Sequence, residues 1–258
     1  MRRTFKREVG EITGVAVLVF SDVHADAEAL SRVVALREKP GFTRIFGRVD
    51  TVVNLGDLLG RGYAPVETLS LVEHLAEEVT FVSLLGNHDH ACIHGIPVSG
   101  SDARSEAAHR RLVGSPLLAA LSHLPVEAVL DATLFVHGGP LRVGDGLTER
   151  PFWQRLSRVP GPDYAGYRYT PQMAFAELER RGLSHLCCGH QHAPLCCQKR
   201  DGRVVSVPLN LEPLPGLPLI GTCTDLSVPS ITRLGACTGQ NPEFAVTDFR
   251  RFWYLRLW

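Results

Sequence analysis

The sequence has no net charge, no long hydrophobic run and no internal repeat, and each absence excludes a class of protein. Its 27 basic residues balance 27 acidic residues, so it lacks the electrostatic footprint of a dedicated nucleic-acid-binding protein. The first apolar stretch, Val15 to Phe20, is far shorter than the roughly 20 residues of a membrane-spanning helix. We therefore interpret it as a core strand, and expect neither a signal peptide nor a membrane segment.

Cysteine is present, but not in the pattern of a secreted disulfide protein. The seven Cys are an odd number without a secretory signal, which favours a reduced, cytoplasmic protein. Cys187-Cys188 and Cys196-Cys197 flank one turn, but adjacent pairs lack the usual spacing of a zinc site. We favour the alternative that Cys187 and Cys188 pack as small core residues.

Strand-like and helix-like segments alternate in the first part of the chain. The patterns predict strands over 15–20, 50–55 and 79–85, and helices over 26–38 and 65–78. This alternation indicates an α/β layered fold whose first sheet is largely parallel. No compositional break marks a linker, and 258 residues with 45% hydrophobic content suit one domain over residues 1–258.

The middle of the chain departs from this alternation in two segments. Residues 91–126 contain Gly, Ser and Pro interruptions and then helical patterning over 105–124, while 140–170 are rich in Pro, Gly, Arg and aromatics. We expect both segments to be small helical or loop insertions that form a cap. Outside them, the patterns predict strands over 128–136 and 183–188, a helix over 170–181, and β-strands and turns over 204–258.

Polar side chains follow the predicted strands at five places. The motifs are Asp22-Val23-His24, Gly56-Asp57, Gly86-Asn87-His88-Asp89, His137-Gly138 and Gly189-His190-Gln191-His192. An α/β fold builds its sites where such strand ends converge. Carboxylate, carboxamide and imidazole groups are ligands for Mn, Fe, Zn or Co rather than for Ca, and they crowd together only around a compensating cation. These groups suffice for two metal ions and leave one His for chemistry.

The order and spacing of the five motifs resemble the calcineurin-like metallophosphoesterases, whose pattern is D-x-H, G-D, G-N-H-D/E, H and G-H-x-H. The resemblance covers residues 22–192 and implies a four-layer α/β/β/α sandwich. It also implies a first metal held by Asp22, His24, Asp57 and His192, and a second held by Asn87, His137 and His190, with Asp57 bridging the two.

The same resemblance implies an enzyme, a metal-dependent hydrolase of phosphate esters or anhydrides. A hydroxide between the metals would attack phosphorus while His88 protonates the leaving group, with Asp89 orienting the His88 imidazole. The expected cofactors are two divalent ions, with Mn first and Fe or Zn as alternatives.

The run Gly56-Asp57-Leu58-Leu59-Gly60-Arg61-Gly62 bears on the branch of the family. Protein Ser/Thr phosphatases have Asp at the place of Gly60, whereas this run is more similar to the small bacterial predicted-phosphodiesterase and diadenosine-tetraphosphatase-like branch. Arg61 remains an expected phosphate contact. We therefore expect a small-molecule phosphodiesterase or nucleotide phosphohydrolase. The alternatives are a phosphoprotein Ser/Thr phosphatase and a catalytically inactive metal-binding scaffold.

Histidines and aromatic residues outside the motifs leave further alternatives open. The other His residues are expected at the surface or as caps, with His90 and His94 close enough to His88 to reach the site; they are His74, His90, His94, His109, His123 and His185. In the segment from Phe152 to Tyr169, aromatics could stack a base while Arg155 or Arg168 meets phosphate. The alternative is that Phe152, Trp153 and the Tyr residues of this segment pack in a small hydrophobic cluster.

Overall fold

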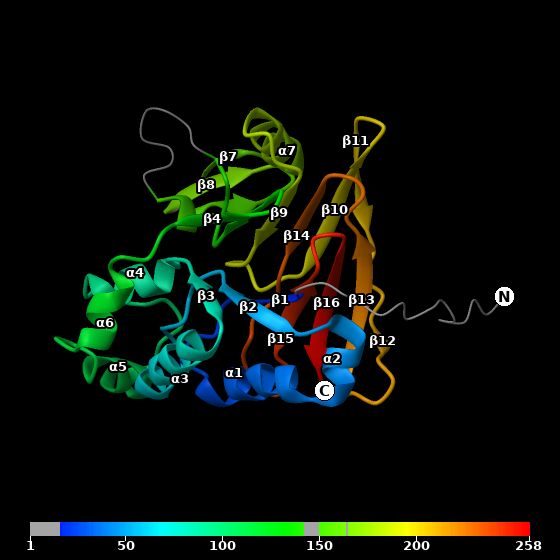
Figure 1. Ribbon diagram of the computed structural model, residues 1–258. Helices are drawn as coiled ribbons and strands as arrows, with labels where there is room; N and C mark the ends of the chain where they lie inside the picture. Colours follow the sequence, from blue (N-terminus) through cyan, green and yellow to red (C-terminus); the bar gives the residue numbers. More distant parts are fainter. Residues whose placement is uncertain (1–15, 142–149, 164) are drawn as a thin grey trace.

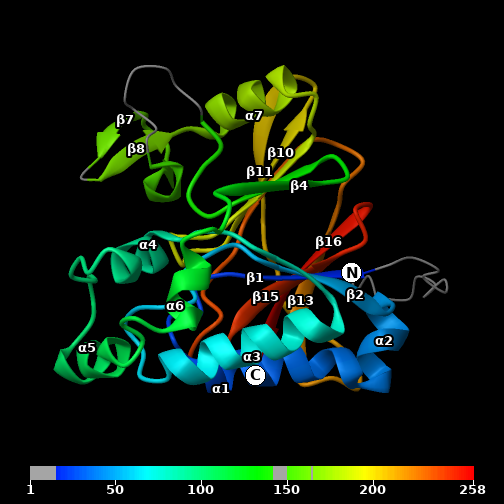
Figure 2. The ribbon, with the colours of Figure 1, turned by 60° about the vertical axis from the view of Figure 1, so that its left-hand side comes forward.

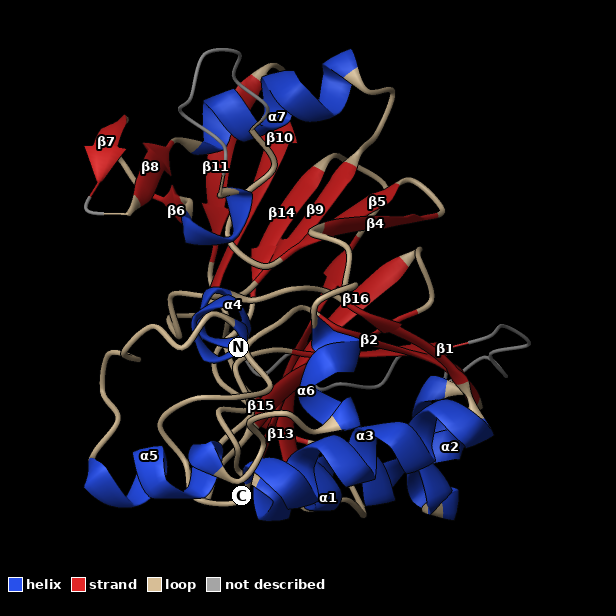
Figure 3. Ribbon diagram, turned by 90° about the vertical axis from the view of Figure 1, so that its left-hand side faces the viewer, coloured by secondary structure: helices blue, strands red, loops and turns tan. Residues whose placement is uncertain are grey.

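Two β-sheets lie face to face between two layers of helices (Figure 1), in a computed structural model that describes residues 16–141, 150–163 and 165–258. Figure 3 shows the order of the layers, with α1, α2 and α3 on one outer face and α7 on the other. The predicted four-layer α/β/β/α sandwich is therefore confirmed. Among the described residues, no helix is both long enough and apolar enough to cross a membrane.

The first sheet has seven strands, and its parallel part comes from the first third of the chain. In spatial order the strands are β12 (Glu212–Pro213), β13 (Leu219–Asp225), β16 (Arg251–Leu257), β15 (Glu243–Thr247), β1 (Ala16–Phe20), β2 (Val49–Asn54) and β3 (Thr80–Ser83). Strand β1 is apolar throughout because both of its faces are covered. Leu18 and Phe20 pack toward the helices, and Val17 and Val19 pack between the sheets.

Helices from the first third of the chain cover the outer face of this sheet. They are α1 (Ala27–Val34) with the 3-10 turn η1 (Ala35–Glu38), α2 (Pro40–Phe46) and α3 (Pro65–Glu78). Asp26 caps α1 by accepting a hydrogen bond from the Ala29 N–H at 3.0 Å. The predicted helices over 26–38 and 65–78 are confirmed, whereas the short α2, with only Phe42 and Phe46 buried, was not predicted.

The second sheet has six strands and carries helix α7 (Pro171–Arg180) on its outer face. Its spatial order is β11 (Arg203–Val207), β10 (Leu195–Arg200), β14 (Ser230–Arg233), β9 (His185–Cys188), β5 (Thr133–Val136) and β4 (Glu127–Leu130). The prediction of one strand over 128–136 is wrong. Strands β4 and β5 form an antiparallel hairpin that turns at Asp131, where φ is +51°.

The two predicted insertions contain regular structure. Segment 91–126 contributes the end of α4 (Asn87–Ile93), then α5 (Ala103–Arg110) and α6 (Pro116–Leu121), which lie together on one side of the molecule (Figure 2). The helical patterning over 105–124 corresponds to two helices, and Ser115 caps the second, α6, by accepting a hydrogen bond from the Leu118 N–H. Segment 140–170 holds η2 (Pro151–Trp153) and a small sheet of β6 (Arg155–Leu156), β8 (Gly166–Tyr169) and β7 (Gly161–Asp163), while 142–149 and 164 lie outside the described residues.

Candidate metal centre and active site

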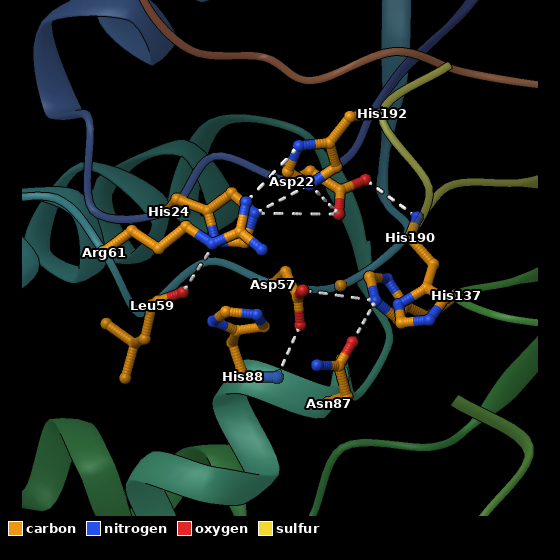
Figure 4. Close-up of polar contacts among 12 residues, drawn as sticks. Asp22, His24, Asp57, Leu59, Arg61, Asn87, His88, His137, His190 and His192 are labelled. Atoms are coloured by element: carbon orange, nitrogen blue, oxygen red, sulfur yellow. Dashed lines mark hydrogen bonds and ion pairs between the residues drawn. The ribbon is translucent and has the colours of Figure 1, made fainter. Parts of the chain in front are cut away.

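Side chains from the five motifs converge in one place, where strands of both sheets end (Figure 4). Asp22 and His24 follow β1, Asp57 follows β2, Asn87 and His88 begin α4, and His137 follows β5; His190 and His192 follow β9. The strand ends of both sheets thus supply side chains to one place, as predicted from the convergence of such ends. Most of these side chains are buried, and only His190 and His192 are partly exposed.

Two groups of potential ligand atoms lie next to each other in this place. Asp22, His24 and His192 form one group, and Asp57, His137 and His190 form the other, each with its atoms within 4.8 Å of one another. Asp57 also groups with His24 and His88, so its carboxylate lies between the two sets. Asn87 joins the second set, since its Oδ1 is 3.0 Å from the Nε2 of His137.

The nitrogens of these imidazoles fit metal coordination. Both ring nitrogens of His190 and Nδ1 of His137 are buried without a hydrogen-bond partner among the described residues, and such unpaired buried groups are costly. The Nδ1 of His24 lies 3.2 Å from the Leu59 carbonyl oxygen, to which it can donate, and this leaves Nε2, 2.9 Å from the His192 Nε2, as the unprotonated nitrogen that a metal could bind. Mixed oxygen and nitrogen donors of this kind suit Mn, Fe or Zn.

The electrostatics keep the two carboxylates ionised. Burial opposes the charge on Asp22, but the hydrogen bond from His192 and the positive His137 outweigh it and hold the pKa at about 2. The pKa of Asp57 is likewise well below its usual value, because attraction to His137 overcomes burial. Burial disfavours a charged His137, yet Asp57 raises the pKa of that imidazole to about 9. A divalent cation at Asp57 would compete with the His137 proton.

Asp89 does not make the contact that was predicted for it. Its carboxylate accepts hydrogen bonds from the backbone N–H groups of Asp57 (2.8 Å), Leu59 (3.0 Å) and Gly86 (3.1 Å). The Nδ1 of His88 has no hydrogen-bond partner among the residues that the structure describes. The reason is the position of Asp89 in the first turn of α4, where its carboxylate reaches back over the helix start. Asp89 therefore holds the loop that carries Asp57.

His88 lies beside the metal ligands and against Gly60. Its ring centroid is 4.7 Å from that of His24, and burial lowers the pKa of its imidazole to about 4. Gly60 has φ of +89°, and a Cβ at this position would lie 2.5 Å from the His88 Nδ1. An Asp in place of Gly60, as in the protein Ser/Thr phosphatases, would require His88 to move.

Arg61 reaches the same centre from the loop after β2. Its Nη1 lies 3.5 Å from the His192 Nδ1, and its Nε donates to the Ser99 carbonyl at 3.2 Å. The Arg61 backbone N–H donates to the Ser101 hydroxyl at 3.1 Å. The neighbouring Gly60 N–H donates to the Nε2 of His109 at 2.9 Å. His109 was expected at the surface or as a cap, and it instead joins α5 to the loop of Arg61.

A buried arginine supports the turn that carries His190 and His192. Arg233, in β14, donates from Nη1 to the Gln191 Oε1 at 2.6 Å and from Nε to the Ala193 carbonyl at 2.6 Å. The same Gln191 oxygen accepts from the Leu156 N–H at 2.8 Å. Sequence reasoning missed Arg233, because it belongs to no motif and lies on a later strand.

Residues outside the motifs take several positions. Cys187 and Cys188 are buried in β9 and pack in the core, as predicted. His185 is also buried, at 7% exposure, and begins strand β9, so the prediction that it lies at the surface or caps a helix is wrong. His90 does reach the region of the site, where it lines a cavity next to His88, whereas His94 is exposed.

Comparisons with known proteins agree with the geometry. A family model described as calcineurin-like phosphoesterase matches residues 15–194. A metallophosphoesterase from Sphaerobacter thermophilus is similar in structure, with a TM-score of 0.64, 24% identity and coverage of 95% of this chain and 89% of that chain. A protein serine/threonine phosphatase from Saccharomyces cerevisiae has a TM-score of 0.56 and 14% identity, with 91% and 73% covered.

A third similar structure, of a candidate diadenosine tetraphosphatase, has a TM-score of 0.50 and 18% identity, with 96% of both chains covered. At these identities the structural likeness extends to the fold alone. A comparison with curated protein sequences finds no match. The family model spans all five motifs, and the fold and the site agree with it. The chain therefore belongs to the calcineurin-like phosphoesterase family and is a hydrolytic phosphoesterase.

Proposed function

We propose that this phosphoesterase uses two divalent metal ions to hydrolyse a small-molecule phosphodiester or a nucleotide phosphoanhydride. The observation that carries the proposal is the pair of adjacent ligand groups with unpaired buried imidazole nitrogens, next to His88 and Arg61. Mn is the first choice of metal, with Fe or Zn as alternatives, because the donors are a mixture of carboxylate, carboxamide and imidazole.

In this proposal the two groups of candidate ligand atoms correspond to two metal ions. Asp22, His24, Asp57 and His192 would hold one ion, and Asp57, Asn87, His137 and His190 would hold the other. When bound, the ions polarise the phosphoryl oxygens and acidify a water molecule. Asp89 fixes the backbone around Asp57 through its three accepted hydrogen bonds, and is therefore a positioning residue.

The remaining side chains act on the substrate itself. The Arg61 guanidinium can bind a phosphate oxygen through charge-assisted hydrogen bonds. His88 donates a proton to the departing oxygen, which is general-acid catalysis. Burial lowers the His88 pKa to about 4, but a phosphate beside the ring favours the protonated form and raises that value again.

A small-molecule substrate is favoured over a phosphoprotein by the loop after β2. Arg61 stands where the protein Ser/Thr phosphatases have a phosphate-binding arginine, which supports the phosphoprotein alternative. However, Gly60 leaves no room for the Asp of that branch unless His88 moves. The sequence has no net charge, which is also compatible with a small substrate.

The test is metal-restored hydrolysis by the purified chain. The protein is stripped of metal, supplied with Mn, Fe or Zn, and assayed with bis(p-nitrophenyl) phosphate, p-nitrophenyl phosphate, a dinucleoside polyphosphate and a phosphopeptide. We expect Mn-restored turnover of the diester or the dinucleoside polyphosphate. Faster hydrolysis of the phosphopeptide would favour the phosphatase alternative, and no turnover with any metal would overturn the proposal.

The variant His88→Ala tests the proposed role of His88 as the general acid. We expect it to bind Mn as the wild type does while kcat falls by about 10²–10⁴-fold, the range of a general acid. His123→Ala is the matched control, because His123 is exposed and outside the site. A His88→Ala protein with unchanged kcat would contradict this role.

A further inference from the structure

The metal centre opens on two sides into cavities whose walls differ in charge. One cavity, of about 460 Å³, is lined by His24, Arg61 and His192 together with the acidic Asp26 and Glu28. The other, of about 600 Å³, is lined by Asn87 and His88. None of the described residues that line this second cavity is acidic. An anionic group is therefore better accommodated in the second cavity, which we call the His88 cavity.

The walls of the His88 cavity combine apolar surface with one cationic side chain. One wall is the segment of Ile96, Pro97 and Val98, Trp153 from η2 contributes an indole, and Arg150 supplies a guanidinium. A cavity of 300–1,000 Å³ with mostly apolar walls and a few polar groups is typical of small-molecule sites. Water or a lone phosphate would not require apolar walls, so the occupant combines apolar surface with negative charge.

Trp153 lines this cavity and also contacts His190, one of the candidate metal ligands. It is partly exposed, and its ring meets that of His190 edge-on at a centroid distance of 5.8 Å. Its neighbour Phe152 is buried and packs against His90 at 5.0 Å. The two aromatics of η2 thus differ: Phe152 is part of the packing, while Trp153 is partly exposed and lines the cavity, with the Arg155 guanidinium 5.6 Å from its ring centroid. Planar bases stack on such rings with little dependence on sequence.

The His88 cavity lies on the side of the metal centre where His88 stands, and this position determines which part of a substrate enters the cavity. A general acid must be within hydrogen-bond distance of the oxygen that it protonates. If His88 is that acid, the leaving group extends from His88 into the cavity that His88 lines. The inference that follows rests on the proposed function in this respect.

We propose that the His88 cavity binds a nucleotide as the leaving group, so that the substrate is a nucleotide phosphoanhydride. The base stacks on Trp153, and the phosphate of the leaving nucleotide faces Arg150. In the reaction, a bond forms between the water oxygen and phosphorus, and the bond from phosphorus to the bridging oxygen breaks. His88 gives a proton to that oxygen, and the water gives up the proton that restores the balance.

The test compares an anhydride that carries nucleosides with one that carries none. Mn-loaded protein is assayed with a symmetrical dinucleoside tetraphosphate and with inorganic tripolyphosphate, and the ratio of their kcat/KM values is the readout. We expect the wild type to prefer the dinucleoside compound and Trp153→Ala to lower the ratio by about tenfold or more, the scale of one lost base–aromatic contact. Trp153→Phe keeps a ring and should retain most of the ratio.

Two further variants complete the design. Trp258→Ala removes a Trp that is 67% exposed at the end of the chain and should leave the ratio unchanged. Arg150→Gln should raise KM for both anhydrides, because each leaving group is anionic. Calorimetric titration of the Mn-loaded protein with a nucleoside monophosphate tests binding directly, and Trp153→Ala should weaken it.

The outcomes separate the two proposals. If the protein hydrolyses bis(p-nitrophenyl) phosphate but does not prefer the dinucleoside compound, the nucleotide inference is overturned and the proposed function stands. An unchanged ratio in a folded Trp153→Ala protein overturns the role of Trp153 and of the cavity. Absence of turnover with every substrate and metal overturns the proposed function, and the inference with it.

Discussion

Arg233 shows how one side chain outside the motifs can fix the geometry of the candidate metal centre. His190 and His192 have positive φ values of 68° and 53°, which non-glycine residues adopt only with support from their surroundings. Arg233 supplies that support through the Gln191 side chain and the Ala193 carbonyl. It is only 7% exposed, so these fixed dipoles, and not water, stabilise its charge.

Replacing Arg233 by Lys should weaken metal binding. A lysine keeps the charge but offers one ammonium in place of a planar fork, so it cannot reach Gln191 and Ala193 together. We expect the Kd for Mn to rise by about 10–100-fold, the usual effect of losing a residue that orients ligands. Titration calorimetry with Mn measures this directly, and Arg203→Lys, on an exposed position of β11, is the control. An unchanged Kd would contradict the role of Arg233.

At the scale of elements, the segment from Ser99 to His109 holds the loop that carries Arg61 in place through hydrogen bonds. Ser99, Ser101 and His109 each accept a hydrogen bond from Gly60 or Arg61. The Nδ1 of His109 lies 2.8 Å from the Ser105 carbonyl, so it carries the proton and leaves Nε2 as an acceptor for the Gly60 N–H. Arg61 itself has φ of +62°, and these contacts hold that conformation.

Loss of the His109 contact should therefore affect substrate binding through Arg61. We expect His109→Ala to raise KM by about threefold to tenfold, the effect of one hydrogen bond, with little change in the Kd for Mn. His109→Gln, whose amide oxygen can accept from Gly60, should recover part of the loss. The decisive comparison is the double variant with Arg61→Ala, which should be no worse than Arg61→Ala alone. If the two effects simply multiply, His109 does not act through Arg61.

The elements that the sequence predicted well are those with a clear burial pattern. Strand β1 is covered on both faces and α3 has one buried side, so a continuous apolar run and a helical stripe identify them. The β4–β5 hairpin was missed because its turn at Asp131 lacks a Gly or Asn-Gly signal.

The same contrast applies within the site. The candidate ligands were expected to lie near one another because each comes within a few residues of the end of a strand, and the topology brings these strand ends together. The direction in which a side chain points could not be predicted from the sequence. Asp89 neighbours His88 in the sequence, but its carboxylate accepts hydrogen bonds from the backbone of Asp57 and Leu59. Contacts made by distant elements could not be predicted either, because nothing in the sequence spacing relates Arg233 or His109 to a motif.

At the scale of the whole molecule, the candidate metal centre joins the two sheets. Asp22 and Asp57 follow strands of the first sheet, while His137, His190 and His192 follow strands of the second. Elsewhere the sheets meet through an apolar layer that includes Val19, Phe135 and Tyr254. Metal ions held by ligands from both sheets would thus stabilise the packing of one sheet on the other, because they bind the folded chain only.

Removal of metal should accordingly lower the Tm of the protein. A ligand at about 100 times its Kd stabilises the folded state by about 2.7 kcal/mol, which corresponds to about 5–10 °C for a chain of this size. The shift should grow with pH, because Asp57 raises the pKa of His137 to about 9 and that imidazole must release its proton to bind a metal. Below this pKa protons compete with Mn, and as pH rises toward it the competition weakens.

Thermal unfolding with Mn or with chelator at pH 6.5 and pH 8.5 measures the shift in Tm, and the chelated protein is the reference at each pH. A Mn-dependent shift of equal size at both values would show that no ligand proton is displaced, and would remove His137 from the metal centre.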